Sequence, residues 1–161
     1  MSVLVSKQKE SRLEVIAHAE RLHRKLIMLM QRNFGVKNVD DFVRESFACG
    51  SIKRENFEYF RYQMTSAKES IDKLAILLTN NLRGANCIYP KTLHELEVRR
   101  DYQNNAIVNC NQILKELQRV VEMFDVDINI YKESIEAIKR EIGLIKSWRQ
   151  RDNAMQARMK G

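Results

Sequence analysis

Residues that readily break a helix are scarce in this chain, and that scarcity constrains its fold more than any other feature. The 161 residues include five glycines and a single proline, whereas an all-β fold would need many more turn-forming residues. Long helices are therefore the simplest reading. The length suits one domain, so we expect residues 1–161 to form a single helical unit with frayed or flexible ends at 1–6 and 154–161.

Four long segments carry apolar residues in steps of three and four, which is typical of bundle helices. They span about Lys7–Asn33, Arg54–Leu82, Pro90–Phe124 and Tyr131–Trp148. Gly35 and Gly84 are expected to stop the first and second segments, and Pro90 fits the first turn of the third. A short additional helix is predicted over Asp40–Phe47. Long helices of matched length joined by short loops pack as antiparallel neighbours, so the predicted fold is all-α, an antiparallel up-and-down four-helix bundle with one extra short helix.

The periodicity also predicts which side chains form the core. The expected core stripes are Ile16, Ala19, Leu22, Leu26 and Met30; Phe57, Phe60, Met64, Ala67, Ile71, Leu74 and Leu78; Leu93, Leu96, Ile107, Cys110, Leu114, Leu117, Val121 and Phe124; and Tyr131, Ile135, Ile138, Ile142 and Ile145. Other apolar residues fall outside these stripes, namely Ile27, Leu29, Ile76, Leu77 and Val120. If exposed, they would form a patch larger than a monomer usually shows, which favours a homo-oligomer.

A polar inset interrupts the third stripe between Leu96 and Ile107. The repeat places Arg100 and Gln103 where core residues belong, and buried side chains of this kind need partners. One interpretation is an internal network with carboxylates of the same or a neighbouring helix. The other is that the inset faces another subunit or an RNA groove.

Positive charge is concentrated near the two ends of the sequence. The net charge is +7; residues 1–32 contain seven Lys or Arg against three acids, and residues 139–161 contain seven against two. In an up-and-down bundle these ends share one pole with the loop between the second and third helices. We call this predicted cluster the basic pole: Lys7, Lys9, Arg12, Arg83, Lys91, Arg149, Arg151, Arg158 and Lys160. Clustered Lys and Arg bind the phosphates of nucleic acids by releasing counterions; the alternative is a solvated, charged face.

The sequence contains no set of residues that predicts catalysis. Gly-rich phosphate loops and nucleophile or zinc-protease motifs are absent. Glu20 and His23 have the Glu-x-x-His spacing of di-iron bundles, but the motif occurs once and lies beside the core stripe. Asp125, Asp127 and Asn129 lack the glycine and closing glutamate of a calcium loop, and we expect the acids to cap the following helix. No enzyme activity, metal or cofactor is therefore expected.

Cysteine usage and hydropathy indicate where the chain resides. Cys49, Cys87 and Cys110 are odd in number and contain no CxxC pair, which favours reduced thiols over a disulfide framework or zinc site. Cys110 falls on the core stripe and is expected to be an inert buried thiol. We find neither a signal peptide nor a bilayer-spanning run. The expected location is the cytoplasm.

The end of the last predicted helix resembles a known family. Residues 142–153 carry Ser147-Trp148 after an aliphatic stretch, followed by Arg149 and Arg151. This pattern resembles the last helix of the accessory variability determinant proteins of diversity-generating retroelements, which belong with the ribosomal RNA intervening-sequence four-helix proteins. The rest of the resemblance is global, in being small, basic, four-helical and without a catalytic set. The chain is longer than typical members and has the extra short helix.

The resemblance implies a non-enzymatic accessory subunit that binds RNA or DNA and partners a reverse transcriptase. It also implies a pentameric ring with basic surfaces that bind the polymerase and nucleic acid. Arg149 and Arg151 are the residues it carries over to this sequence. The alternative function is an oligomeric helical scaffold or interaction module without a nucleic-acid role.

Overall fold

The computed structural model of the chain describes residues 2–36, 54–124 and 126–161, with side chains from residue 14 in the first range and residue 58 in the second. The described residues form four long helices: α1 (Ser2–Gln31), α3 (Arg54–Cys87), α4 (Leu93–Phe124) and α5 (Lys132–Lys160). Short 3₁₀ turns follow α1, at Asn33–Gly35, and precede α5, at Ile128–Tyr131. The predicted helix over Asp40–Phe47 lies outside the described residues.

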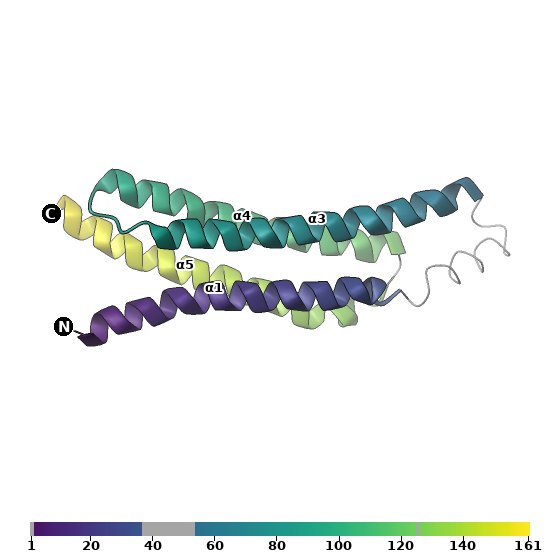
Figure 1. Cartoon of the computed structure of the whole chain (residues 1–161), viewed down its shortest axis with the longest axis horizontal. Coiled ribbons are helices and arrows are strands. Elements are labelled where there is room, and N and C mark those ends of the chain that lie inside the picture. Colours follow the sequence, from purple (N-terminus) through teal and green to yellow (C-terminus); the bar gives the residue numbers. More distant parts are fainter. Residues whose placement is uncertain (1, 37–53, 125) are drawn as a thin grey trace.

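The helices form an antiparallel up-and-down bundle, which confirms the predicted fold class. Neighbours in the chain lie side by side, and α5 closes the bundle by packing against α1 as well as α4 (Figure 1). The start of α1, the end of α5 and the loop between α3 and α4 all lie at the same end of the molecule. We call this end the terminal pole and the opposite end, where α1 stops and α3 begins, the distal pole.

The stop after α1 is confirmed at Gly35. Asn33, Phe34 and Gly35 have φ angles of 48°, 55° and 77°, a left-handed run that is incompatible with further α-helix. Phe34 is fully buried, and the Tyr131 hydroxyl donates a hydrogen bond of 2.6 Å to its carbonyl oxygen. The reversal is therefore anchored to the start of α5.

Gly84 does not stop α3, contrary to the prediction, because the helix continues to Cys87. The Tyr102 ring of α4 packs against this glycine so closely that a Cβ atom there would lie 2.8 Å from Tyr102 Cε1. Ordinary Cβ contacts are much longer than this. Gly84 therefore permits the close approach of α3 and α4 rather than ending a helix.

The third and fourth helices also differ from prediction at their ends. Pro90 precedes α4, which begins at Leu93 after a capping box: Thr92 Oγ1 accepts from the Glu95 N–H at 3.2 Å, and Glu95 Oε2 accepts from the Thr92 N–H at 3.1 Å. The last helix runs past Trp148 to Lys160. Asp127 caps the 3₁₀ turn before that helix, since its side chain accepts from the Asn129 N–H at 2.9 Å.

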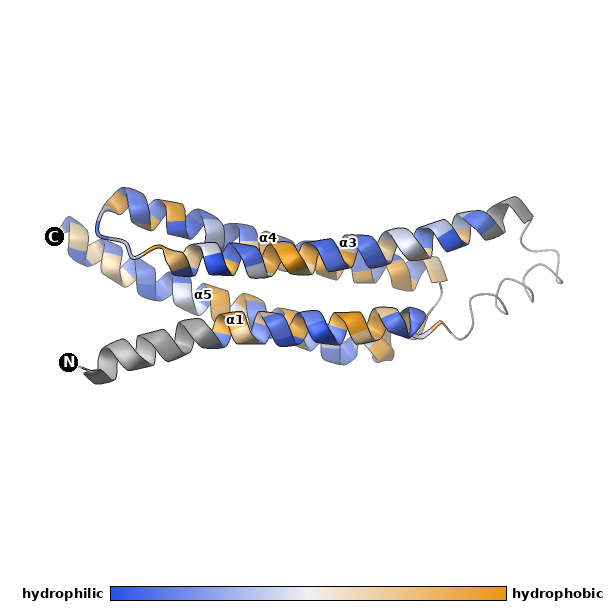
Figure 2. Ribbon diagram, in the orientation of Figure 1, coloured by the Kyte–Doolittle hydropathy of each residue, from blue (hydrophilic) through white to orange (hydrophobic). Residues whose placement is uncertain are grey.

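Each helix contributes one mainly apolar stripe to the core (Figure 2), but all four predicted stripes are displaced by one residue at some positions. In α3 the buried residue is Ala75, whereas the predicted Leu74 is half-buried. In α4 the buried residues are Leu96, Arg99, Gln103, Ala106, Asn109, Cys110, Ile113, Leu117, Val120 and Phe124. The prediction placed Arg100, Ile107, Leu114 and Val121 in the core instead of Arg99, Ala106, Ile113 and Val120. Both members of the last three pairs are apolar, so periodicity alone does not separate them.

The same displacement affects α1 and α5. Val15, rather than Ile16, is fully buried in α1. Ile135 and Ile142 are half-buried. The inward positions of α5 are Ser134, Ile138, Glu141, Ile145, Trp148 and Asp152, and they continue from the buried Tyr131 of the preceding 3₁₀ turn. Of the apolar residues outside the predicted stripes, Leu29 and Val120 are buried and Ile27 is half-buried against the core, so these three do not add to an outer patch. Ile76 and Leu77 are exposed.

Candidate nucleic-acid interface

The elements that carry the predicted basic pole come together at the terminal pole. Lys7, Lys9 and Arg12 lie on the backbone of α1 near its start, but their side chains are outside the part of the chain that the structure describes. Lys91 is exposed in the loop before α4. Arg151, Arg158 and Lys160 are exposed on the last turns of α5, where cations also complement the negative end of the helix dipole.

Two of the predicted cations are engaged within the bundle. Arg83 Nη2 on α3 lies 2.7 Å from Glu20 Oε1 on α1, in an exposed ion pair. Arg149 is half-buried, and its Nη1 donates a hydrogen bond of 2.8 Å to Asn104 Oδ1 on α4. These contacts leave Arg151, Arg158, Lys160 and Lys91 as the more accessible cations of the set.

The surface of α5 beyond Glu141 carries exposed charge of one sign. Asp152 is the single acidic residue between 142 and 161, and it is only 3% exposed because it points into the bundle. Lys146, which was not among the predicted residues, is exposed and adds to the positive surface. A phosphate backbone approaching these turns therefore meets no exposed carboxylate side chain on the part of α5 beyond Glu141.

The polar inset forms an internal network, which decides between the two interpretations left open by the sequence. Arg99, not Arg100, is fully buried, and its Nε lies 3.1 Å from Asp152 Oδ2 on α5. Gln103 Nε2 donates to the same oxygen at 2.8 Å. The guanidinium also lies over the Trp148 ring, 5.0 Å from its centroid, in a cation–π contact. Arg100 is half-buried nearer the surface, where it donates to Asn153 Oδ1 and Gln156 Oε1 of α5.

This network positions the cationic turns of α5. Buried ion pairs contribute little net stability, but they penalise any register in which a partner is lost. Arg99 and Gln103 both require Asp152 opposite them, so α5 is held against α4 next to Arg151. Sequence reasoning missed Arg99 because the predicted register of the third helix placed Arg100 inward. It missed Asp152 because it ended the last helix at Trp148, although the spacing Ile145, Trp148, Asp152 continues the inward stripe.

A second buried polar pair lies further along α5. His18 Nδ1 of α1 is 2.5 Å from Glu141 Oε2, and the Glu141 side chain is completely buried. Burial raises the pKa of Glu141 to about 8. Burial, with the nearby Arg140, lowers the pKa of His18. Both directions favour a neutral pair, in which the protonated carboxyl donates to the imidazole.

Cys110 of α4 is also buried next to this pair. Burial raises the pKa of its thiol, and the negative charge of Glu141 adds to the effect. A thiol with a raised pKa carries little thiolate at neutral pH and is a poor nucleophile.

The Glu-x-x-His spacing of α1 leads to two separate contacts rather than to one centre. His23 Nε2 lies 2.7 Å from Asp72 Oδ1, and Glu20 bonds Arg83. Among the described residues, no three His, Cys, Asp or Glu side chains are grouped closely enough to hold a metal ion. In the same part of the chain, none of the helices combines the length and apolar character needed to cross a bilayer.

Comparisons with protein-family models, with curated proteins and with solved structures found no match to this chain. The features that bear on its function are therefore the cationic surface of α5, the buried network that holds it, and the resemblance of residues 142–153.

Proposed function

We propose that this protein is a non-enzymatic nucleic-acid-binding subunit that contacts the phosphate backbone through the basic pole. The observation that carries the proposal is the surface of α5 beyond Glu141, where the exposed charged side chains are all cationic and the one acid is buried against Arg99. Contacts of this kind are independent of base sequence and confer strong salt dependence.

The fixed placement of these cations supports the proposal further. Asp152 joins α5 to α4 through Arg99 and Gln103, and Arg100 adds bonds to Asn153 and Gln156. Because the helix is already held, nucleic acid can bind without first ordering this segment, which removes one entropic cost of association.

The partner is proposed from the resemblance of the Ser147-Trp148 segment. It implies an accessory role beside the reverse transcriptase of a diversity-generating retroelement, with a pentameric ring as the assembly. On this proposal the basic pole holds RNA or DNA while the polymerase supplies the chemistry.

Charge reversal at the two poles tests the proposal. Arg151→Glu with Arg158→Glu changes two exposed side chains of the terminal pole, and Arg32→Glu with Lys132→Glu makes the same charge change on exposed residues of the distal pole. In filter binding to RNA and DNA of unrelated sequences, the first variant is expected to lose affinity by about tenfold or more, and the second variant is expected to lose much less affinity. Exposed substitutions change stability by only ~0.5 kcal/mol, so both variants should keep their helical circular dichroism.

Equal losses from the two variants would show that net charge, rather than the basic pole, governs binding. If the unaltered protein binds no nucleic acid even at low salt, the alternative of an oligomeric scaffold or interaction module would be favoured.

A further inference from the structure

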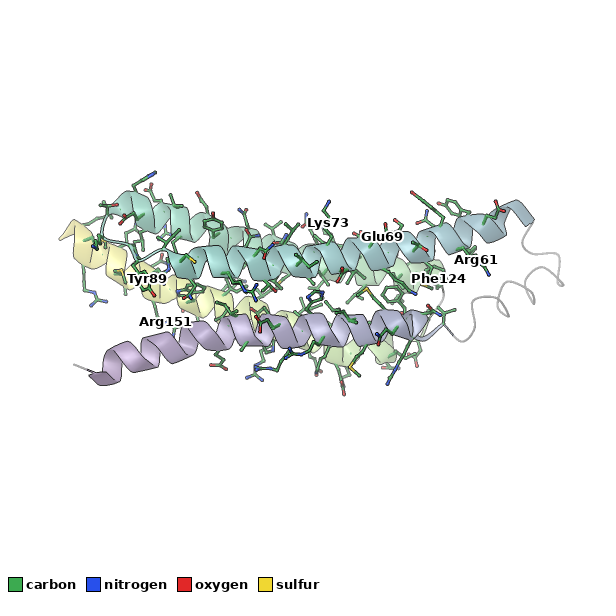
Figure 3. All side chains as sticks on the ribbon, in the orientation of Figure 1. Arg61, Glu69, Lys73, Tyr89, Phe124 and Arg151 are labelled. Carbon is green, nitrogen blue, oxygen red and sulfur yellow. The ribbon has the colours of Figure 1, made fainter. Side chains whose placement is uncertain are left out.

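Tyr89 is a prominent feature of the terminal pole that the proposed function does not use. It lies in the loop between α3 and α4, two residues before Lys91, and it is 69% exposed. No other large hydrophobic side chain among the described residues is more exposed. Figure 3 shows it on the same side of the molecule's midpoint as Arg151.

The backbone around Tyr89 is held on both sides. Before it, the Ile88 N–H donates to the Ala85 carbonyl at 3.3 Å, and Arg99 Nη1 donates to the Ile88 carbonyl at 3.4 Å. After it, Pro90 has a fixed φ angle and restricts the residue that precedes it. The Lys91 N–H then donates to Glu95 Oε2 at 2.7 Å. An exposed ring on a constrained loop loses little freedom when a ligand binds it.

One buried arginine links this loop to the cationic turns of α5. Arg99 bonds the carbonyl oxygen of Ile88, next to Tyr89, and also pairs with Asp152, next to Arg151. The aromatic ring and the cations of α5 are therefore presented by elements fixed to the same guanidinium. Lys91, on the other side of Pro90, adds an exposed cation to the loop.

We propose that Tyr89 is a base-stacking residue and that the basic pole takes single-stranded nucleic acid. This inference rests on the proposed function and deepens it. Both faces of a duplex base pair are covered by its neighbours, whereas an unpaired base can stack on an exposed aromatic ring. Cations beside the ring neutralise the adjoining phosphates, which is the arrangement that sequence-tolerant single-strand binding requires.

Abasic strands separate stacking from phosphate contact. The measurement is the affinity of the full chain for a thymidine oligonucleotide and for an abasic deoxyribose-phosphate strand of equal length, in one buffer. The unaltered protein is expected to bind the base-bearing strand ~5- to 150-fold more tightly, the range of stacking on one aromatic residue. Tyr89→Ala should remove that preference and leave affinity for the abasic strand unchanged, whereas Tyr89→Phe should retain it.

Tyr62 provides a matched control, since it is 66% exposed on α3 toward the distal pole; Tyr62→Ala should bind both strands as the unaltered protein does. The stacking role is overturned if Tyr89→Ala keeps the full preference for the base-bearing strand, or if its affinity falls by the same factor for both strands. In either case binding itself would persist, and the proposed function would stand. Absence of binding to either strand by the unaltered protein would overturn both proposals together.

Discussion

At the scale of single residues, the bundle is distinguished by polar side chains at core positions. His18, Arg99, Gln103, Glu141 and Asp152 are all buried, and each contacts another member of the set across a helix boundary. Apolar contacts tolerate sliding of one helix along another, but a buried polar group loses its partner when the register changes. These pairs therefore favour one alignment of α5 against α1 and α4.

The His18–Glu141 pair predicts a specific pH dependence of stability. In the folded protein the pKa of Glu141 is raised from its ordinary value of 4.5 to about 8, and the pKa of His18 is lowered from 6.5. Between pH 6.5 and 8 the folded pair therefore holds one proton and the unfolded pair none, so stability falls as pH rises through this window. The loss is about 2 kcal/mol at most. Between pH 4.5 and 6.5 the pair holds one proton in both the folded and the unfolded state, so it does not make stability depend on pH in that range.

Urea unfolding at a series of pH values measures this effect. Glu141→Gln retains the shape of the side chain without its titration, and it should show no such fall between pH 6.5 and 8. The difference between the two proteins isolates the pair from other groups, including Arg21, which lies near enough to act on both members. Parallel curves for the two proteins would contradict the assignment of a neutral pair.

The Arg99–Asp152 pair gives a second prediction at this scale. Asp152→Asn leaves the buried Arg99 charge without its counter-charge, which is expected to cost ~3–5 kcal/mol. Replacing both partners, as Arg99→Met with Asp152→Leu, removes the charges together and should be less destabilising than the single change. Denaturant midpoints rank the three proteins, and a double variant as unstable as Asp152→Asn would argue against charge burial as the cause.

At the scale of the helices, the number, order and approximate extent of the elements followed from sequence, while their inward faces followed only in part. In α5 the true stripe passes through Ser134 and Glu141, and hydrophobicity favoured the neighbouring Ile135 and Ile142 instead. The helix ends at Gly84 and Trp148 were misplaced for a related reason, because close packing by Tyr102 and a buried carboxylate are tertiary effects. A local pattern carries no information on partners that distant segments supply.

Adjacent residues of α4 test the corrected register. Ile113 is fully buried and Leu114 is half-buried, so the two isomeric side chains differ mainly in environment. Ile113→Ala should cost ~2–5 kcal/mol, as large-to-small core changes do, and Leu114→Ala should cost about half as much or less. Thermal melts would compare them, and a larger loss for Leu114→Ala would restore the register first expected from the sequence.

At the scale of the whole molecule, antiparallel topology places the two ends of the described chain and the α3–α4 loop at one pole (Figure 1). The meeting of these three segments at one pole could be predicted from the sequence, since it depends only on the order and antiparallel packing of the helices. The roles of Tyr89 and Asp152 did not, because both depend on contacts made by Arg99. Leu29 and Val120 contribute to the core rather than to an outer patch.

Self-association is predicted on the remaining exposed apolar residues of α3. Ile76 and Leu77 are adjacent and 45% and 40% exposed, and the resemblance implies a pentamer. Light scattering at micromolar concentration is expected to give a mass several times that of the 19.0 kDa chain. Ile76→Glu with Leu77→Glu should reduce that mass, because charged groups disfavour burial at an interface. A monomeric mass for the unaltered protein would contradict the prediction.

The most direct test of the basic pole is the salt dependence of binding. The logarithm of affinity falls linearly with the logarithm of salt concentration, with a slope of ~0.9 per neutralised phosphate for duplex and ~0.7 for single strands. Arg151→Gln with Arg158→Gln removes two exposed cations without adding negative charge. If both contact phosphates, the slope measured on a single strand should decrease by ~1.4. An unchanged slope would contradict phosphate binding by this pole.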